Sequence, residues 1–554
     1  MKKTVLALLL AASILGATAC NSKTQTVTQR PTDGSDTPFV STTSEIAPET
    51  VETVNPEKDE IAKIENLTQR PKNQYDIDIH FNEESKSIDV EQKLTYVNNT
   101  GDDLEEIYFN MIPEAFSKKK GGVDVESVKI GTEDLKFKKV DGTVYALALP
   151  TKLEKGKMVT IDMKYTVKIP ENADRFGYYK DTYNLGNALI TPAIYEDGQW
   201  LKQPYIDLGD AFYTEIADYR VSINAPKDYL IASTGTLIND VYVAENVRDF
   251  AFTITKDMDI LCEEYEDIAL NVFYPKANPN VGKHVMDVAK KSLSLFNEKL
   301  GKYPYDTLNM VCTAMPGGIG GMEYPGLIMM TVEEDIESAL DLYNGTITVE
   351  EYLKKLDDEY GNDKPEKLSD IESSVPTVSP DETKQAILYV VDSLTHSTAH
   401  EIAHQWFYGI VGNDEVRHPW IDEGMCRFLE GYYSNYYKDG DDYTFSIFEL
   451  LKNMDEAIYD EAESNDNEQH TVDLTRSLYD FKNDKESYGE IYYKSAAMIF
   501  HMYEKLGDED FISALKEYVQ KFAYSEVTPD EFRTFWSGKG DFSELFDIYL
   551  KKSE

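Results

Sequence analysis

Two histidines one helical turn apart, with a glutamate beside the first, are the residues of this chain that most directly predict chemistry. His400, Glu401 and His404 stand in the segment Thr-Ala-His-Glu-Ile-Ala-His-Gln-Trp. Residues four apart leave the same face of a helix, so the two imidazoles can bind one ion. Glu401 leaves the helix beside that pair, where its carboxylate can reach a water on the ion without binding the ion. The spacing therefore predicts a metal site with an adjacent general base.

Glu423 is the candidate third ligand, because it follows His404 after a gap of 18 residues. Two imidazoles and one carboxylate leave the fourth tetrahedral position open for water or substrate, as in a catalytic zinc site. His396 lies one turn before His400, but a fourth protein ligand would close that position, so we interpret it as a residue that packs near the ligands. The alternative is a chance match, which is rare in a chain with 8 histidines among 554 residues.

These motifs resemble those of a known family. His-Glu-Ile-Ala-His-Gln-Trp-Phe, followed by Pro-Trp-Ile-Asp-Glu-Gly, closely resembles the aminopeptidase N family of gluzincin metallopeptidases, which includes leukotriene hydrolase. The run Gly320, Gly321, Met322, Glu323, Tyr324 resembles the family's Gly-x-Met-Glu-Asn strand edge, with Tyr324 in place of asparagine. By this resemblance the run lines the substrate site and Glu323 binds the free α-amine. A buried glutamate suits that task, since charge-assisted hydrogen bonds are strong. The alternative for Glu323 is a salt-bridged structural carboxylate.

Two further residues extend the expected site. Tyr492, Tyr493, Lys494, Ser495 and Ala496 resemble the family's Tyr-x-Lys-Gly-Ala, which implies that the Tyr492 phenol donates a hydrogen bond to the tetrahedral oxyanion. Tyr493 is the fallback for this role. Glu430, seven residues after Glu423, lies on the same helical face and could accept the other N–H of a ligand histidine. A solvated surface glutamate is the alternative.

The resemblance implies one zinc ion per chain, peptide substrates and the release of amino-terminal residues. Two other functions stay open. A zinc endopeptidase of the same fold is favoured by Tyr324, by the lack of a recognisable second amine-binding motif and by the lack of a long helical solenoid. A surface lipoprotein with a catalytically weak site could instead bind peptides without cleaving them.

The amino terminus predicts export. Residues 1–19 combine a basic start with a short apolar stretch and have the pattern of a signal peptide. Small residues before Cys20 resemble a bacterial lipobox, which predicts lipidation of Cys20 and a lipid anchor on the extracytoplasmic face of the cell membrane. Cleavage after Ala-Thr-Ala without lipidation is the alternative. The rest of residues 20–68 is polar and predicts a disordered tether.

Charge and cysteine content exclude some classes of partner. A net charge of −46 argues against nucleic acid and against electrostatic binding to anionic lipid, so the anchor is the expected membrane contact. Beyond Cys20 the chain has only Cys262, Cys312 and Cys426, which do not make a disulfide framework. At least one of these thiols must be free, and we assign Cys426 to the core.

The elements that position the site predict a multidomain α+β fold. Apolar residues alternate in 75–81, 88–96, 159–169 and 219–223, so residues 69–260 predict an antiparallel, sandwich-like β domain. Residues 261–504 predict a thermolysin-like catalytic domain, with a helix that ends at Gly301 and a strand over 305–313. Residues 505–554 predict a short helical carboxy-terminal segment.

The helix that carries the histidines has clear boundary signals. Ser379, Pro380 and Glu382 form a capping-box start with proline at the first helical position, and Gly412 is the expected stop. Residues 331–378, before this helix, form an acidic insertion that could lie over the cleft or extend into solvent.

Overall fold

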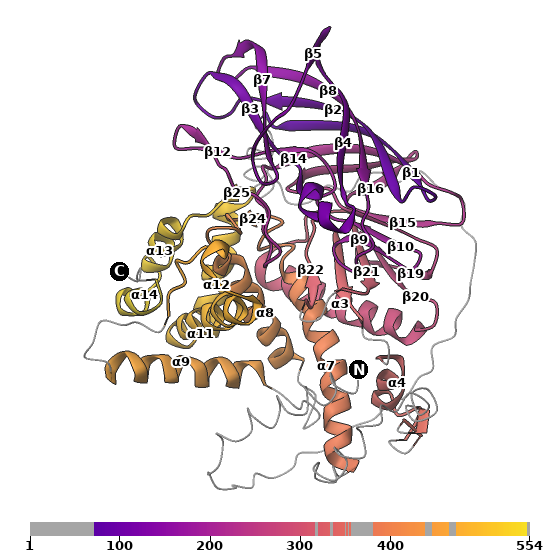
Figure 1. Ribbon diagram of the computed structural model, residues 1–554. Coiled ribbons are helices and arrows are strands. Elements are labelled where there is room, and N and C mark those ends of the chain that lie inside the picture. The colour runs from indigo at the N-terminus through magenta and orange to yellow at the C-terminus, as the bar shows by residue number, and fades with distance from the viewer. Residues whose placement is uncertain are drawn as a thin grey trace. The chain divides into compact units, whose positions relative to one another are not determined.

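The computed structural model describes residues 71–550, apart from 316–318, 333–335, 349–350, 353, 356–379, 438–445 and 465–471 (Figure 1). The predicted signal peptide, the lipidation site at Cys20 and the whole of the predicted tether lie outside the described residues. So does the larger part of the predicted insertion at 331–378. No helix in the described part of the chain is both long and apolar enough to cross a bilayer.

An eight-stranded sheet dominates the amino-terminal domain, in the order β16-β17-β14-β1-β2-β8-β4-β5. Its strands are β1 (Asn73–Asn82), β2 (Ser87–Val97), β4 (Gly122–Ile130), β5 (Glu133–Leu135), β8 (Met158–Lys168), β14 (Ala217–Asn224), β16 (Thr236–Ile238) and β17 (Val241–Val247). Buried and exposed residues alternate along the whole of β1, which is the pattern of a strand with one face on a core. The alternation in the sequence therefore located β1, β2, β8 and β14.

One pairing differs from the expected antiparallel arrangement, because β1 and β14 run parallel. The chain forms many other strands between them, so β14 enters the sheet from the same end as β1. Parallel neighbours require such a long crossover, and the local pattern of a strand does not reveal its direction.

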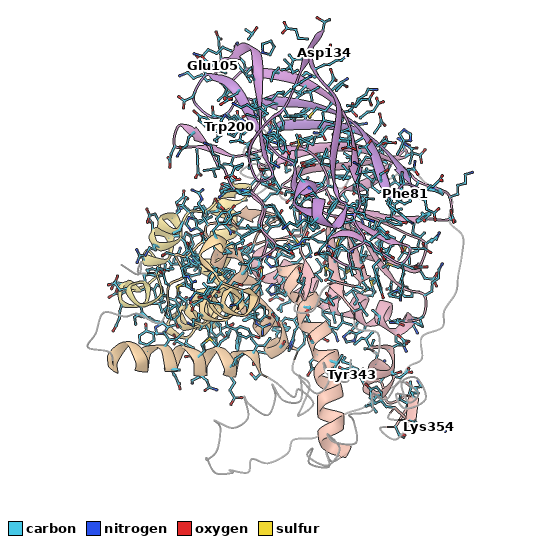
Figure 2. The ribbon with its side chains drawn as sticks, viewed as in Figure 1. Phe81, Glu105, Asp134, Trp200, Tyr343 and Lys354 are labelled. Atoms are coloured by element: carbon cyan, nitrogen blue, oxygen red, sulfur yellow. The ribbon has the colours of Figure 1, made fainter. Side chains whose placement is uncertain are left out.

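Smaller sheets complete this domain. They comprise β3 (Leu104–Asn110), β6 (Lys138–Asp141), β7 (Val144–Leu153), β9 (Phe176–Tyr179), β10 (Thr182–Leu185), β11 (Thr191–Pro192), β12 (Tyr195–Glu196), β13 (Gln199–Trp200), β15 (Leu230–Ser233) and β18 (Phe252–Thr255), with the 3₁₀ helix η2 (Ile112–Lys119). Trp200, labelled in Figure 2, stacks on Tyr108 with 5.7 Å between ring centroids and so joins the β12–β13 hairpin to β3.

The catalytic domain is built on a five-stranded sheet in the order β19-β20-β21-β23-β22. The strands are β19 (Met258–Tyr265), β20 (Ile268–Pro275), β21 (Thr307–Thr313), β22 (Gly321–Met322) and β23 (Leu327–Thr331). β20, β21 and β23 are parallel, whereas β19 and the short edge strand β22 are antiparallel to their neighbours. Helix α3 (Pro279–Leu300) makes the crossover from β20 to β21 and ends before Gly301.

This sheet is covered on both faces. Met310 of β21 and Ile328 of β23 belong to the core formed with the helices, while Val311 and Met329 belong to the core of the β domain. Successive residues of a strand point to opposite faces, so the sheet joins the two cores. The β domain is thus packed directly on the sheet that carries β22.

The remaining helices form the helical side of the catalytic domain: α7 packs with α3 on the other face of the sheet, and the other helices pack on these two and on one another (Figure 1). They are α4 (Ile336–Tyr343), α7 (Pro380–Ala403), α8 (Trp420–Tyr436), α9 (Ile447–Ser464), α10 (Asp484–Tyr488), α11 (Ser495–Leu506), α12 (Asp508–Phe522), α13 (Pro529–Ser537) and α14 (Ser543–Tyr549), with the 3₁₀ helix η3 (Leu478–Asp480) and the π-helical turn η4 (Gly489–Lys494). Two-residue strands β24 (Val411–Gly412) and β25 (Ser525–Glu526) pair in parallel. Helix α4, which lies within the predicted insertion, packs its apolar face against α3 and α7. This helix therefore belongs to the core.

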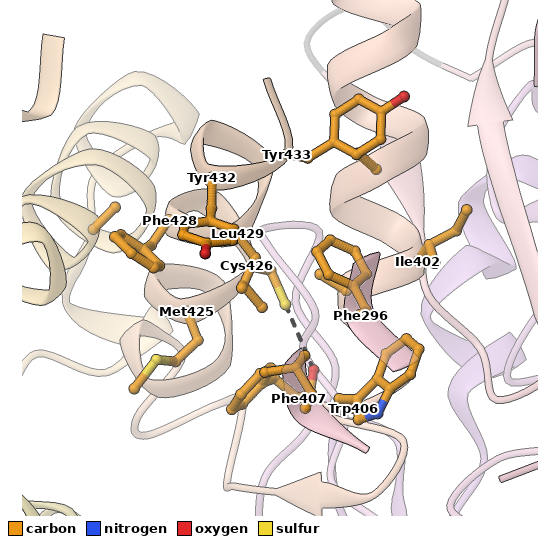
Figure 3. Close-up of a cluster of buried hydrophobic side chains, with 14 of the residues drawn as sticks. Phe296, Ile402, Trp406, Phe407, Met425, Cys426, Phe428, Leu429, Tyr432 and Tyr433 are labelled. Carbon is orange, nitrogen blue, oxygen red and sulfur yellow. Dashed lines mark hydrogen bonds between the residues drawn. The ribbon is translucent and has the colours of Figure 1, made fainter. Parts of the chain in front are cut away.

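Apolar side chains fix α8 against the end of α7. Figure 3 shows Cys426 between Phe407 and Leu429, with its thiol directed at the Phe407 carbonyl, 3.8 Å away. Cys312 and Cys426 are buried and Cys262 is exposed, and all three are free thiols. Burial raises the pKa of the Cys426 thiol to about 12, which keeps it protonated and suits a core residue.

Candidate active site

Helix α7 carries His400 and Glu401, and its last turn leads into His404. The helix begins at Pro380, as predicted, but it ends at Ala403, so the expectation that it continues to Gly412 was wrong. The chain turns over residues 404–410, where Tyr408 has a φ of +118°, and Gly412 instead lies in β24. Pairing of β24 with β25, more than a hundred residues away in the sequence, decides where the helix ends.

Three donor atoms converge where α7 and α8 meet. His400 Nε2 and His404 Nε2 are 3.1 Å apart, and Glu423 Oε2 lies 3.1 Å from the first and 3.3 Å from the second. Donors held about 2.0–2.1 Å from one zinc ion at tetrahedral angles lie about 3.3 Å apart. The residues therefore fit a zinc ion in both donor type and spacing.

Hydrogen bonds behind the two rings orient the nitrogens that face this point. His404 Nδ1 lies 2.9 Å from the Phe407 carbonyl oxygen, which can only accept, so this nitrogen donates. His400 Nδ1 lies 3.3 Å from Glu430 Oε2, a carboxylate oxygen that also accepts. In the neutral tautomer with its proton on Nδ1, which suits these partners, each ring keeps a lone pair on Nε2. Both rings thus present a ligand atom to the same point.

The electrostatics of the cluster favour a cation. Burial by itself raises the pKa of Glu423, but hydrogen bonds from His400 and His404 outweigh it and hold this pKa well below its usual range. Burial lowers the pKa of His400, whereas the carboxylates of Glu423 and Glu430 raise it to about 9 overall. Ionised carboxylates around the two rings therefore provide a negative environment for a bound positive charge.

Glu401 lies beside the three donors, against the edge of the sheet. A Cβ added to Gly321 would lie 2.2 Å from Glu401 Oε1, so the carboxylate is in direct contact with β22. The side chain is 4% exposed, and its Oε2 has no hydrogen-bond partner within the described part of the chain. Burial raises the pKa of Glu401 to about 7, although both histidines act to lower it. A buried carboxylate whose pKa lies near neutral pH is suited to act as a general base.

Tyr492 reaches the same region from the π-helical turn η4. Its ring centroid is 6.1 Å from that of His400, and it packs on Tyr488 at 4.7 Å. Burial, and then the nearby charge of Glu423, raises the pKa of the Tyr492 phenol well above its ordinary value, so it stays a hydrogen-bond donor. Short π-helical turns occur often at functional sites because they redirect side chains. Tyr493, the fallback, bonds to Arg427 instead.

The expected amine-binding run forms β22 and the turn after it. Gly320 precedes the strand, and Met322 accepts a hydrogen bond at its Sδ from Arg175 of the β domain, 3.2 Å away. Glu323 is 3% exposed, and its Oε1 has no hydrogen-bond partner among the described residues. Oxygen atoms of Glu323 and Asp422 and a ring nitrogen of His404 all lie within 4.8 Å of one another. Two buried carboxylates therefore stand side by side next to the metal-ligand cluster.

Tyr324 points away from this cluster. It is fully buried, it donates a hydrogen bond to Asn187 Oδ1 at 2.8 Å, and its ring stacks on Phe212. Gly186 makes room for the ring, because an added Cβ there would overlap the Tyr324 hydroxyl. The tyrosine in place of asparagine thus serves packing against the β domain.

The sequence did not single out three residues that the structure places at the site. Asp422 precedes Glu423, and Arg427 follows it by one turn, so only their helical positions could have suggested them. Asp210 approaches from the β domain, where it forms an ion pair with Arg175. Burial is the main cause that raises the pKa values of Glu323 and Tyr492, and the negative charge of Asp210 adds to it. No motif or spacing around Asp210 in the sequence predicts that it lies near the site.

Comparison with known proteins finds similarity to a peptidase domain, to aminopeptidases and to leukotriene A-4 hydrolase. Residues 378–549 match the family model described as Peptidase family M1 domain. Aminopeptidase 2 of Candida albicans is 21% identical over 508 residues, which are 85% of this chain and 45% of that protein. Leukotriene A-4 hydrolase of Xenopus laevis is 27% identical over 144 residues, 26% of this chain and 23% of that protein. The chain thus spans less than half the length of either relative.

A solved structure shares the fold. The M1 zinc metallopeptidase from Deinococcus radiodurans superposes with a TM-score of 0.52 over 87% of this chain and 93% of that chain, at 13% identity. The matched model covers α7, α8 and the helices that follow, which include every residue of the histidine and glutamate motif. Residues 378–549 are thus similar to peptidase family M1 domains, the aminopeptidase N family of gluzincins that the motifs of this chain resemble.

Proposed function

We propose that this protein is a zinc-dependent aminopeptidase that releases residues from the amino terminus of peptides. The observation that carries the proposal is the convergence of His400 Nε2, His404 Nε2 and Glu423 Oε2, with Glu401 beside them. A zinc ion bound there would supply Lewis acidity toward the scissile carbonyl and acidify a water. His400, His404 and Glu423 are the residues that would hold it.

Each remaining residue has a task that follows from its position. Glu401 takes the proton of the attacking water and delivers it to the leaving amine, since its carboxylate is buried beside the ligands. Tyr492 donates a hydrogen bond to the oxyanion that develops on the substrate. The edge strand β22 offers backbone groups to an extended peptide, which would add to the sheet as a further strand.

Glu323 and Asp422 form the receptor for the substrate ammonium. An ammonium that donates two hydrogen bonds of about 2.8 Å at a tetrahedral angle joins oxygens about 4.6 Å apart. This matches two carboxylates whose oxygens lie within 4.8 Å. A cation placed between them would also stabilise both in the ionised form. The pair supports an amino-terminal preference, and the burial of Tyr324 removes one argument for an endopeptidase.

Metal content and activity test the hydrolase claim together. The purified protein is expected to hold one zinc per chain, to lose hydrolysis of an unblocked fluorogenic peptide on treatment with a chelator, and to regain it when zinc is added. Bound zinc without cleavage of any peptide would favour a peptide-binding module. Cleavage that persists in the metal-free protein would contradict the proposal.

We also propose export and lipid anchoring through Cys20, supported by the basic and apolar start of the chain and the small residues before this cysteine. Mass spectrometry of the protein from a bacterial host is expected to show a diacylglyceryl group on an amino-terminal Cys20. A Cys20→Ser variant should appear in the soluble fraction. An unmodified mature chain that begins at Cys20 would contradict lipidation.

A further inference from the structure

We infer that Arg427 is a positioning residue that ties the metal-ligand histidine His400 and the turn bearing Tyr492 into one fixed arrangement. This inference rests on the proposed function, because it assigns His400 and Tyr492 the roles given above. Arg427 lies on α8, one turn after Glu423, and its side chain is only 12% exposed. A buried guanidinium is costly unless a partner of opposite charge compensates it, so its presence this close to the site calls for a functional explanation.

The first contact is with Glu430. Arg427 Nη1 lies 2.5 Å from Oε1 and 2.6 Å from Oε2 of this carboxylate, which is 2% exposed. Glu430 Oε2 in turn lies 3.3 Å from His400 Nδ1. Arg427 therefore holds the carboxylate that accepts the hydrogen bond of the ligand ring. Partners at this distance from a metal set the ring orientation and the basicity of the ligand nitrogen.

The second contact is with the π-helical turn η4. Arg427 Nη2 donates to the Tyr493 hydroxyl at 2.9 Å, and the guanidinium lies over the Tyr493 ring, 4.6 Å from its centroid. Tyr493 is the neighbour of Tyr492, and Tyr488 packs against both rings. One planar group thus joins α8 to the turn that directs Tyr492 at the site.

Fold stability alone does not account for this arginine. Arg427 Nε is buried and has no hydrogen-bond partner in the described part of the chain. Replacement of a buried ion pair by apolar side chains of similar volume is often neutral or stabilising. Only arginine can bond a carboxylate and a phenol from adjacent nitrogens while it stacks on a ring, so lysine is a poor substitute.

The test compares R427K with a double variant, R427M/E430M, which removes both charges of the buried pair together and so leaves neither of the two unpaired. Zinc affinity is measured by competition with a chromogenic chelator, and unfolding of the metal-free protein is followed by circular dichroism. We expect both variants to bind zinc about 10–100-fold more weakly than the parent, as for other residues that support a ligand histidine. The unfolding temperature of the metal-free double variant should stay near that of the parent.

Tyr493→Phe separates the two contacts. It should leave zinc affinity unchanged and lower kcat about tenfold at constant KM, because a small misplacement of Tyr492 is costly. Arg417→Lys is the matched control, since Arg417 pairs with Glu196 and Asp414 and is partly exposed outside the ligand cluster. It should change neither quantity.

Two results would overturn the inference: zinc affinity of R427K and the double variant within twofold of the parent, or Y493F with parental kcat. An inactive parent protein that binds zinc would refute the proposed function. The link between Arg427 and His400 could still be tested in that case, because zinc affinity is measured without turnover.

Discussion

Glu401 is the residue whose role depends most on its surroundings, since its carboxylate is buried in contact with Gly321 and beside the two ligand histidines. Glu401→Gln keeps the shape of the side chain and removes the proton acceptor. We expect kcat to fall by about 10²–10⁴-fold, the usual contribution of a general base, with zinc content unchanged. Steady-state kinetics and metal analysis of the same preparation check this. Parental turnover in the variant would exclude Glu401 as the base.

The residues that the sequence could predict at this scale share short helical spacings. His400, Glu401 and His404 lie within about one turn, and Glu423 and Glu430 lie two turns apart on another helix. Asp422 lies beside Glu323, Arg427 contacts Tyr493 of η4, and Asp210 approaches from the β domain. Such contacts depend on how elements pack, which spacing along one helix does not encode.

At the scale of elements, the close approach of β22 to α7 depends on one glycine. A Cβ at position 321 would lie 2.2–2.5 Å from three atoms of the Glu401 carboxylate end, so Gly321→Ala must displace the base. We expect kcat to fall at least tenfold, since misplaced catalytic groups are costly, while zinc stays bound. Gly538→Ala, at the end of α13 and outside the site, is the control, because the nearest atom to its Cβ would be the Phe535 carbonyl oxygen, at 3.1 Å. Equal activity of the two variants would contradict this account of the strand.

The packing of α3 on α7 predicts a dependence of stability on pH. His284 of α3 bonds to Thr395 of α7 at 2.8 Å, and burial lowers its pKa from 6.5 to about 4. Above pH 6.5 the ring is neutral in both the folded and unfolded states, so it adds no pH dependence. As pH falls from 6.5 toward 4, only the unfolded state gains the proton, and stability falls.

The loss attributable to His284 is about 2 kcal/mol between pH 6.5 and pH 5, at about 1.4 kcal/mol per pH unit. His284→Gln can keep a hydrogen bond to Thr395 but cannot titrate. Urea unfolding at the two pH values should therefore show the variant losing about 2 kcal/mol less than the parent. Equal losses in both proteins would show that His284 titrates normally in the folded state.

Elements with a strong local signal were predicted well, and those decided at a distance were not. The alternation in β1 and β8 and the proline starts of α7 and α13 are properties of a few consecutive residues. The end of α7 at Ala403 and the parallel pairing of β1 with β14 depend on partners far along the chain. A glycine at 412 is a reasonable helix stop, but tertiary pairing ends the helix earlier.

At the scale of the whole molecule, Arg248 joins the β domain to two distant segments. This buried side chain donates to the Tyr408 carbonyl at 2.7 Å and the Ser525 carbonyl at 3.0 Å, and it pairs with Glu526 at 2.7 Å. Arg248→Met leaves those carbonyls without a donor, which should cost about 3 kcal/mol of unfolding free energy. Thermal and urea unfolding measure it, and Lys164→Met, in an exposed pair, is the control. A loss no larger than that of the control would contradict this role.

The division into an amino-terminal β domain and a catalytic domain followed from a change of periodicity near residue 260. The way the two domains join was not visible in the sequence, because β21 and β23 of the shared sheet form runs of buried residues without alternation. Such runs are typical of strands with both faces buried, and only the structure shows that the β domain packs on one of these faces. Arg175 and Asp210 reach the site across this junction.

The central claim is that a free amino terminus, held by Glu323 and Asp422, directs zinc-dependent cleavage. The most direct test is the rate of hydrolysis of one fluorogenic peptide with a free amino terminus against that of its N-acetylated twin. We predict at least about 100-fold faster cleavage of the free form, the difference expected when a charge-assisted ammonium site is left unfilled. Glu323→Gln and Asp422→Asn should each reduce that ratio. Equal cleavage of both peptides by the parent would contradict the account and identify an endopeptidase.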